Sequence, residues 1–146
     1  MRFCSSLTLA GLASLATTSV LAQAPFFGAP QNLAQVTVGE EVVVSVFQGD
    51  TNSQFENVAI ALGISQCFNG ADSCSGAGGG LFDVFYTGPF NATGLVGANH
   101  FQNFTVTIPS FFEAGQFAQV TAALFALVGA EENPSLETTA VILEVV

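Results

Sequence analysis

Short runs of apolar residues, rich in Val, Phe, Ile and Thr, are separated along most of the chain by Gly, Asn, Asp and Pro. Runs of this length, bounded by turn-forming residues, are typical of β-strands. The pattern predicts seven strands, at residues 34–38, 41–48, 57–64, 81–86, 101–108, 118–128 and 138–145. Seven short strands in one chain favour an all-β sandwich.

The strands at 101–108 and 138–145 alternate between apolar and polar residues. One face of the first carries Phe104, Val106 and Ile108, and one face of the second carries Val141, Leu143 and Val145. A period of two indicates a strand with one buried and one wet face. The strand at 118–128 is apolar on both faces apart from Gln119 and Thr121, which suits a central strand, although its alanines are also compatible with a helix. Ser110 and Glu113 have the spacing of a helix capping box and predict a single helical turn.

The chain divides into three segments. Residues 1–22 resemble a secretory signal peptide, because Met1 and Arg2 precede an uncharged run at 7–21. Residues 23–35 form a Pro-rich lead, and residues 36–146 form the sandwich domain. The alternative for the first segment is a retained membrane anchor. No later run is long enough to span a bilayer, so we expect a soluble secreted protein without stable membrane insertion.

The charge of the chain is one-sided. No Lys or Arg follows Arg2, whereas all eleven acidic residues lie after residue 22. Eleven acids against no Lys or Arg give the segment after the signal a net charge of −11, with His neutral. Binding to nucleic acid or phosphate relies on Lys and Arg, so both functions are excluded. Electrostatic steering favours a basic partner.

Cys67 and Cys74 are the only cysteines outside the signal segment, with six residues between them. An even pair in a secreted chain predicts a disulfide, and free thiols are the alternative. No metal site is expected, because zinc needs four ligands and only His100 could join this pair. The glycine-rich stretch at 76–80 lacks the Lys and the following helix of a P-loop, so it predicts a flexible tether and no cofactor.

Candidate catalytic chemistry is sparse. His100 is the only side chain that titrates near neutrality when unperturbed, so any His-assisted nucleophile depends on it, but an ordinary loop histidine is the simpler interpretation. Carboxylate pairs could serve a glycosidase, yet the chain has no Trp and one Tyr to stack on sugars. Clustered acids could bind calcium weakly, but no EF-hand spacing is present. We therefore expect no enzyme and no catalytic residue.

Two sequons, at Asn91 and Asn103, are candidate N-glycosylation sites. The fifteen Phe residues are a second unusual feature, because several fall outside the predicted strands. Such residues can anchor a protein interface or can close the open ends of the core. Phe111 and Phe112 are the candidate protein contacts, since two adjacent residues at a crossover can hardly both face inward.

The chain resembles the necrosis-inducing secreted (Nis) proteins of plant-associated fungi. The resemblance covers roughly 36–146 and rests on strand and turn sequences at 57–63, 85–89, 104–109, 124–130 and 134–136. It implies an immunoglobulin-like antiparallel β-sandwich of about seven strands. It further implies an effector that binds host proteins, suppresses pattern-triggered plant immunity at receptor-like or receptor-associated kinases, and sometimes induces cell death. The sequence leaves open whether the protein stays extracellular or enters the host cell. The segment at 67–80 and the lack of basic residues depart from the family pattern.

Two functions from different classes follow from these observations. The first is a non-enzymatic, secreted, acidic effector that binds a host protein. The alternative is an extracellular or cell-wall structural or adhesion module without a host target, in which acidity confers solubility and the Phe residues only pack. The sequence leaves the oligomeric state open.

Overall fold

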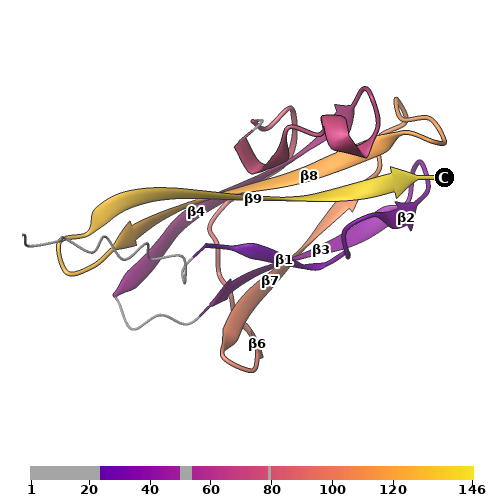
Figure 1. Ribbon diagram of the computed structural model, residues 1–146. Helices are drawn as coiled ribbons and strands as arrows, with labels where there is room; N and C mark the ends of the chain where they lie inside the picture. Colours follow the sequence, from indigo (N-terminus) through magenta and orange to yellow (C-terminus); the bar gives the residue numbers. More distant parts are fainter. Residues whose placement is uncertain (1–23, 50–53, 79) are drawn as a thin grey trace, which may run out of the picture.

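The computed structural model describes residues 24–49, 54–78 and 80–146, which form two β-sheets packed face to face (Figure 1). The spatial order of the four-stranded sheet is β1 (Phe26–Ala29), β3 (Glu41–Gly49), β7 (Asn99–Thr107) and β6 (Gly94–Val96). The order of the five-stranded sheet is β2 (Ala34–Val36), β9 (Asn133–Val145), β8 (Phe117–Val128), β4 (Phe55–Cys67) and β5 (Asp83–Gly88). Two short 3-10 turns, η1 (Ala71–Ser73) and η2 (Gly76–Gly78), lie between β4 and β5. The predicted all-β sandwich is confirmed.

Each of the seven predicted strands overlaps a strand of the structure, and two further strands, β1 and β6, were missed. Both lie at sheet edges and are only four and three residues long, next to Gly and Pro. Strand β1 also makes the expected Pro-rich lead part of the sandwich. The signal predicted at 1–22 lies outside the described residues. No helix within the described ranges is long and apolar enough to cross a membrane.

One pair of strands departs from the expected antiparallel arrangement. β2 runs parallel to β9, with Ala34 opposite Leu143 and Val36 opposite Val145. The reason is topological, because the chain leaves the four-stranded sheet after β1 and joins the edge of the other sheet at β9, which β1 also contacts. Apart from β2, the strand order is consistent with an immunoglobulin-like sandwich. Here β1, β3, β6 and β7 correspond to the four strands A, B, D and E of one immunoglobulin sheet.

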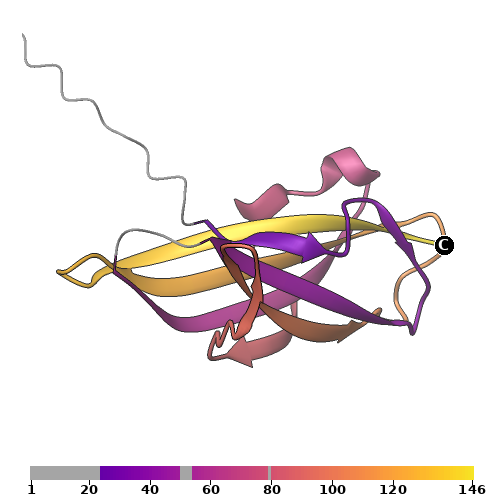
Figure 2. The same cartoon turned by 90° about the horizontal axis from the view of Figure 1, so that it is seen from below.

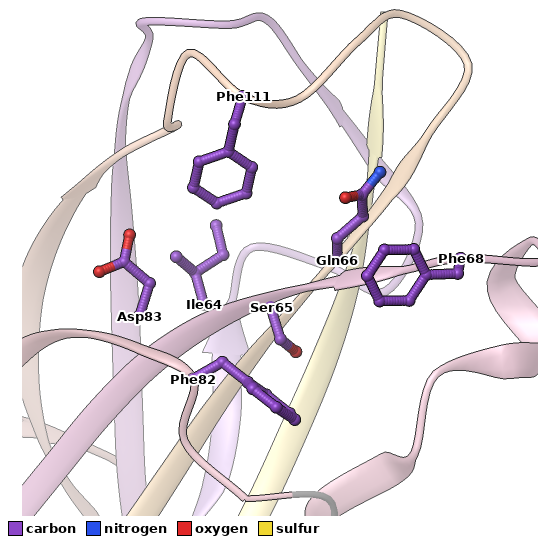
Figure 3. Close-up of a pocket in the computed structure, with 7 residues that line it drawn as sticks. All are labelled: Ile64, Ser65, Gln66, Phe68, Phe82, Asp83 and Phe111. Carbon is purple, nitrogen blue, oxygen red and sulfur yellow. The ribbon is translucent and has the colours of Figure 1, made fainter.

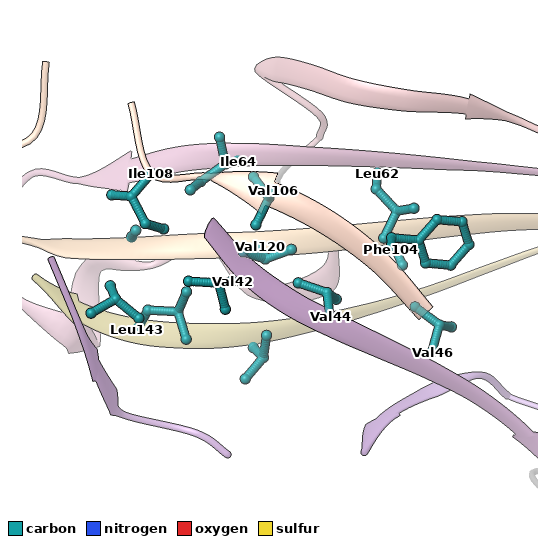
Figure 4. Packing of buried hydrophobic residues seen from close by; sticks show 14 of the residues in the cluster. Val42, Val44, Val46, Leu62, Ile64, Phe104, Val106, Ile108, Val120 and Leu143 are labelled. Atoms are coloured by element: carbon teal, nitrogen blue, oxygen red, sulfur yellow. The ribbon is translucent and has the colours of Figure 1, made fainter. Parts of the chain in front are cut away.

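The core lies between the two sheets and consists of alternate residues from both (Figure 4). Val44 and Val46 of β3 face Leu62 of β4 and Leu124 of β8, and all four are fully buried. The alternation predicted for 101–108 is confirmed, since Phe104, Val106 and Ile108 are buried and the intervening residues are exposed. Strand β8 lies between β4 and β9, as its apolar sequence predicted.

A row of aromatic rings crosses the outer face of the four-stranded sheet. Figure 2 shows the ribbon of this sheet from below. Phe26, Phe47 and Phe101 are directly opposite one another on β1, β3 and β7. Their ring centroids are 5.4 Å apart for the first pair and 4.9 Å for the second, and both pairs are stacked. The Phe101 ring lies over Gly94 of edge strand β6, where a Cβ would collide with it. The row therefore ties both short edge strands to the centre of the sheet.

The helical turn predicted at residues 110–113 is absent, and this segment is a turn of the loop between β7 and β8. The backbone N–H of Phe112 donates to the Pro109 carbonyl at 3.3 Å. The Glu113 N–H donates to the side chain of Gln116 at 2.9 Å, and Gly115 bonds the end of β9. Two local turn bonds and one tertiary bond to β9 replace the predicted capping box.

Replacing Gly94 by Ala tests the aromatic row. The new methyl group would displace the Phe101 ring, so we expect a loss of about 1–3 kcal/mol in the free energy of unfolding, measured by urea denaturation. Gly78→Ala is the matched control, because a Cβ there meets nothing within 4 Å. A Gly94→Ala protein as stable as this control would contradict the assigned packing.

Candidate functional site

The structure separates the Phe residues outside its strands into buried and exposed groups. Phe90 and Phe112 are 3% exposed and belong to the core. Phe68, Phe82 and Phe111 are 82%, 73% and 54% exposed. Phe112 is therefore a core residue whose ring fills the end of the sandwich, and only one ring of the adjacent pair is exposed, as the sequence indicated. Phe111 remains a candidate contact.

The three exposed rings surround one pocket of about 360 Å³ (Figure 3). The remaining lining residues are Ile64, Ser65, Gln66 and Asp83. In Figure 3 the Phe111 ring points from its loop toward Ile64, the Asp83 carboxylate stands beside Ile64, and Phe82 lies below Ser65. Ile64 is buried, so the pocket opens from the core at its floor to a rim of exposed rings. Exposed apolar groups gathered in this way are typical of a binding surface.

Each ring is placed by a different constraint. Phe68 directly follows Cys67, the last residue of β4, whose disulfide to Cys74 spans a Cα–Cα distance of 4.8 Å. Phe82 directly precedes β5. Phe111 stacks on Phe112 with ring centroids 4.7 Å apart. The buried ring of Phe112 thus supports the exposed ring of Phe111.

The loop that carries Phe68 and Phe82 is fastened to the outer face of the five-stranded sheet. The Gly76 N–H donates to Gln119 Oε1 at 3.0 Å, and Gln119 Nε2 donates to the Gly76 carbonyl at 2.9 Å and to Thr121 Oγ1 at 2.8 Å. Gln119 is 1% exposed, because η2 covers this part of β8 and β9. In Figure 1 the two 3-10 turns lie on the side of β8 that faces away from β3. The flexible tether predicted for 76–80 is therefore wrong at Gly76, which side-chain hydrogen bonds hold in place.

The pocket lies where the sheet loses a strand. The pairing of β4 with β5 ends at Ile64 opposite Asp83, whereas its pairing with β8 continues to Cys67. Within the described ranges, no strand pairs with the β5 side of β4 from Ser65 to Cys67. Backbone groups at such an edge can pair with an added strand.

Asp83 is the only charged side chain that lines the pocket. Asp83 is exposed, and residues 3–146 contain no Lys or Arg that could neutralise it. The pocket therefore combines aromatic surface with a carboxylate that lacks a counterion from this chain. A cationic group is the complementary ligand.

The other candidate residues lie away from the pocket. His100 belongs to strand β7, opposite Gln48 and Leu95, so the loop expected for it is wrong. Asn91 is exposed in the β5–β6 connection, with its N–H bonded to Gln102 Oε1 at 2.7 Å. Asn103 is exposed on β7 and accepts a hydrogen bond from Ser45 Oγ at 2.6 Å. Within the described ranges, no three His, Cys, Asp or Glu side chains are grouped as metal ligands.

Sequence reasoning missed Phe82 and Asp83 as parts of a site. Both fell inside the strand predicted at 81–86, which the structure begins at Asp83. A Phe between a glycine-rich stretch and an acidic residue was the available signal, but it does not reveal where pairing begins. Phe68 is one of the Phe residues outside the predicted strands, for which the sequence left interface contact and core packing open.

The comparison with protein families supplies one match. The sequence model of the Nis1 family matches residues 21–144 of the chain, which is most of its length. No curated protein matches at a significant level. The resemblance found in the strand and turn sequences is thereby confirmed.

Alanine substitutions distinguish the supporting ring from the exposed ring. Phe112→Ala removes a buried ring and should lower the free energy of unfolding by about 3–5 kcal/mol. Phe111→Ala removes a half-exposed ring and should cost about 1 kcal/mol or less. Urea denaturation measures both values. Equal losses would show that the two rings share the same environment.

Gln119→Leu tests how the pocket loop is held. The substitution leaves the backbone groups of Gly76 without their side-chain partner, so we expect a loss of about 1–3 kcal/mol in unfolding free energy. Amide hydrogen exchange should become faster at residues 71–78, while the exchange rates in β3 and β7 stay the same. Unchanged exchange at 71–78 would show that the disulfide alone holds the loop.

Proposed function

Because the chain belongs to the Nis1 family, we propose that this fungal effector-like protein is secreted and acts by binding a host protein, without catalysing a reaction. The observation that carries the proposal is the pocket ringed by Phe68, Phe82 and Phe111. Large exposed rings at one place cost solubility, so their gathering around a pocket favours a contact role. The disulfide between Cys67 and Cys74, next to Phe68, is typical of an extracellular protein.

The resemblance to Nis proteins supports a more specific role. It favours suppression of pattern-triggered immunity in plants, through the cytoplasmic domain of a receptor-like or receptor-associated kinase, with cell death as a further outcome in some hosts. This role requires the secreted protein to reach the inside of the host cell. The net charge of −11 after the signal segment favours a partner that presents a basic surface.

The pocket owes its suitability for binding to its supports. The disulfide fixes Cys67, which directly precedes Phe68, the Phe111 ring stacks on its buried neighbour, and Gln119 holds the loop between Phe68 and Phe82. A contact surface that is already ordered before binding loses less conformational entropy when the partner arrives. The surface can therefore bind a partner with little rearrangement of its own.

Co-precipitation tests the proposal. Protein secreted from residues 1–146 should capture receptor-kinase cytoplasmic domains and dampen an elicitor-induced oxidative burst, and Phe82→Ser should weaken capture by at least about tenfold. Leu136→Ser is the matched control, since Leu136 is 66% exposed but pairs with Phe125, toward the far end of β8 and β9. We expect this control to bind like the unaltered protein.

Two outcomes would overturn the proposal. One is the absence of both capture and burst suppression by the unaltered protein. The other is strong retention on fungal wall material with no effect on the host, which would favour the structural or adhesion alternative. Equal capture by the Phe82→Ser and Leu136→Ser proteins would remove the pocket from the interface and leave host binding intact.

A further inference from the structure

We propose that the pocket receives an arginine side chain carried on an extended segment of the partner protein. This inference rests on the proposed function and assigns the chemistry of the ligand that its pocket takes. It follows from three observations on the pocket: the aromatic rim, the carboxylate of Asp83, and the unpaired edge of β4.

The rim and the carboxylate together fit a guanidinium group. Arginine is planar, stacks on aromatic faces and pairs with carboxylates, and its aliphatic stem packs on apolar surface. Phe68, Phe82 and Phe111 supply the rings, Asp83 supplies the charge, and Ile64 supplies an apolar floor. Gln66 and Ser65, whose side chains lie on opposite sides of β4 in Figure 3, offer further hydrogen-bond acceptors.

The cation must come from another protein. Residues 3–146 contain no Lys or Arg, so neither a loop of this chain nor the sandwich of a second copy can supply it. Two copies would also repel each other, since each carries a net charge of −11 after the signal segment. Charge complementarity therefore selects a basic partner over self-association.

The edge of β4 indicates how the arginine is presented. β5 pairs with one side of β4 as far as Ile64. Beyond Ile64 no described strand pairs with this side, and Ser65 and Gln66 of the unpaired stretch line the pocket. An extended segment that pairs there continues the line of β5 and places alternate side chains toward the pocket. The volume of about 360 Å³ is near the lower end of the roughly 300–1,000 Å³ found for ligand pockets.

Titration with short peptides tests the inference. The probe is an acetylated and amidated Val-Thr-Arg-Thr-Val peptide, and its partner probe carries citrulline, a neutral isostere, in place of arginine. We expect the arginine peptide to shift the NMR signals of the Phe68, Phe82 and Phe111 rings and of the Ser65–Cys67 amides. The citrulline peptide should bind about fivefold or more weakly.

Two variants isolate the role of the carboxylate. Asp83→Asn should lower the affinity for the arginine peptide about fivefold, so that the two peptides bind with similar affinity. Glu56→Gln removes the same charge from the other end of β4 and should leave the affinity within about twofold. Both residues are exposed, and urea denaturation verifies that both variants fold.

Three results would overturn the inference: equal binding of the arginine and citrulline peptides, equal effects of Asp83→Asn and Glu56→Gln, or no shift of the three rings at millimolar peptide. These results are distinguishable from failure of the proposed function. If Phe82→Ser abolishes capture of the host protein and Asp83→Asn does not, host binding stands and the arginine assignment fails.

Discussion

The sandwich depends on apolar contact between its two sheets. Val44 and Val46 on one sheet pack against Leu62 and Leu124 on the other, in a core without charged side chains (Figure 4). The paired cysteines close a local loop, and no Lys or Arg follows Arg2 to form ion pairs between the sheets. One side-chain hydrogen bond does join them, because Asn57 Nδ2 of β4 donates to Gln48 Oε1 of β3 at 2.6 Å. Burial of apolar surface, at about 25 cal/mol per Å², therefore carries the association of the sheets.

The same lack of cations shapes the polar groups. The buried polar side chains of the described residues are amides and hydroxyls, among them Gln119 and Thr121, and every acidic residue in these ranges is at least partly exposed. A buried carboxylate without a cationic partner would be costly, so the acids remain in contact with water. The surface consequently carries a strong negative charge. Gln119 performs the structural task of joining loop to sheet with neutral hydrogen bonds.

The strands were largely predictable, and the loops were not. Apolar runs bounded by turn-forming residues located β3, β7 and β8 to within one or two residues, and in β7 the buried face also imposes a period of two on the sequence. β1 and β6 are too short to show a period, and their stability comes from rings on neighbouring strands. The residues at 110–113 had a local helix signal, but the backbone of the adjoining residues Gly115 and Gln116 bonds to Val145 at the end of β9 instead of continuing a helix. Local signals fail where distant partners satisfy the backbone.

By itself, the sequence determined the all-β class, the family and the sign of the charge, since each depends on residue type and local pattern alone. Only the tertiary structure decided which rings are exposed. Phe111 and Phe112 are chemically identical neighbours, and the position of the crossover over the end of the sandwich buries one and leaves the other at the pocket. Phe82 and Asp83 line the pocket because β5 pairs with β4 only as far as Ile64. Exposure at such places depends on where non-local pairing stops, which adjacent residues do not encode.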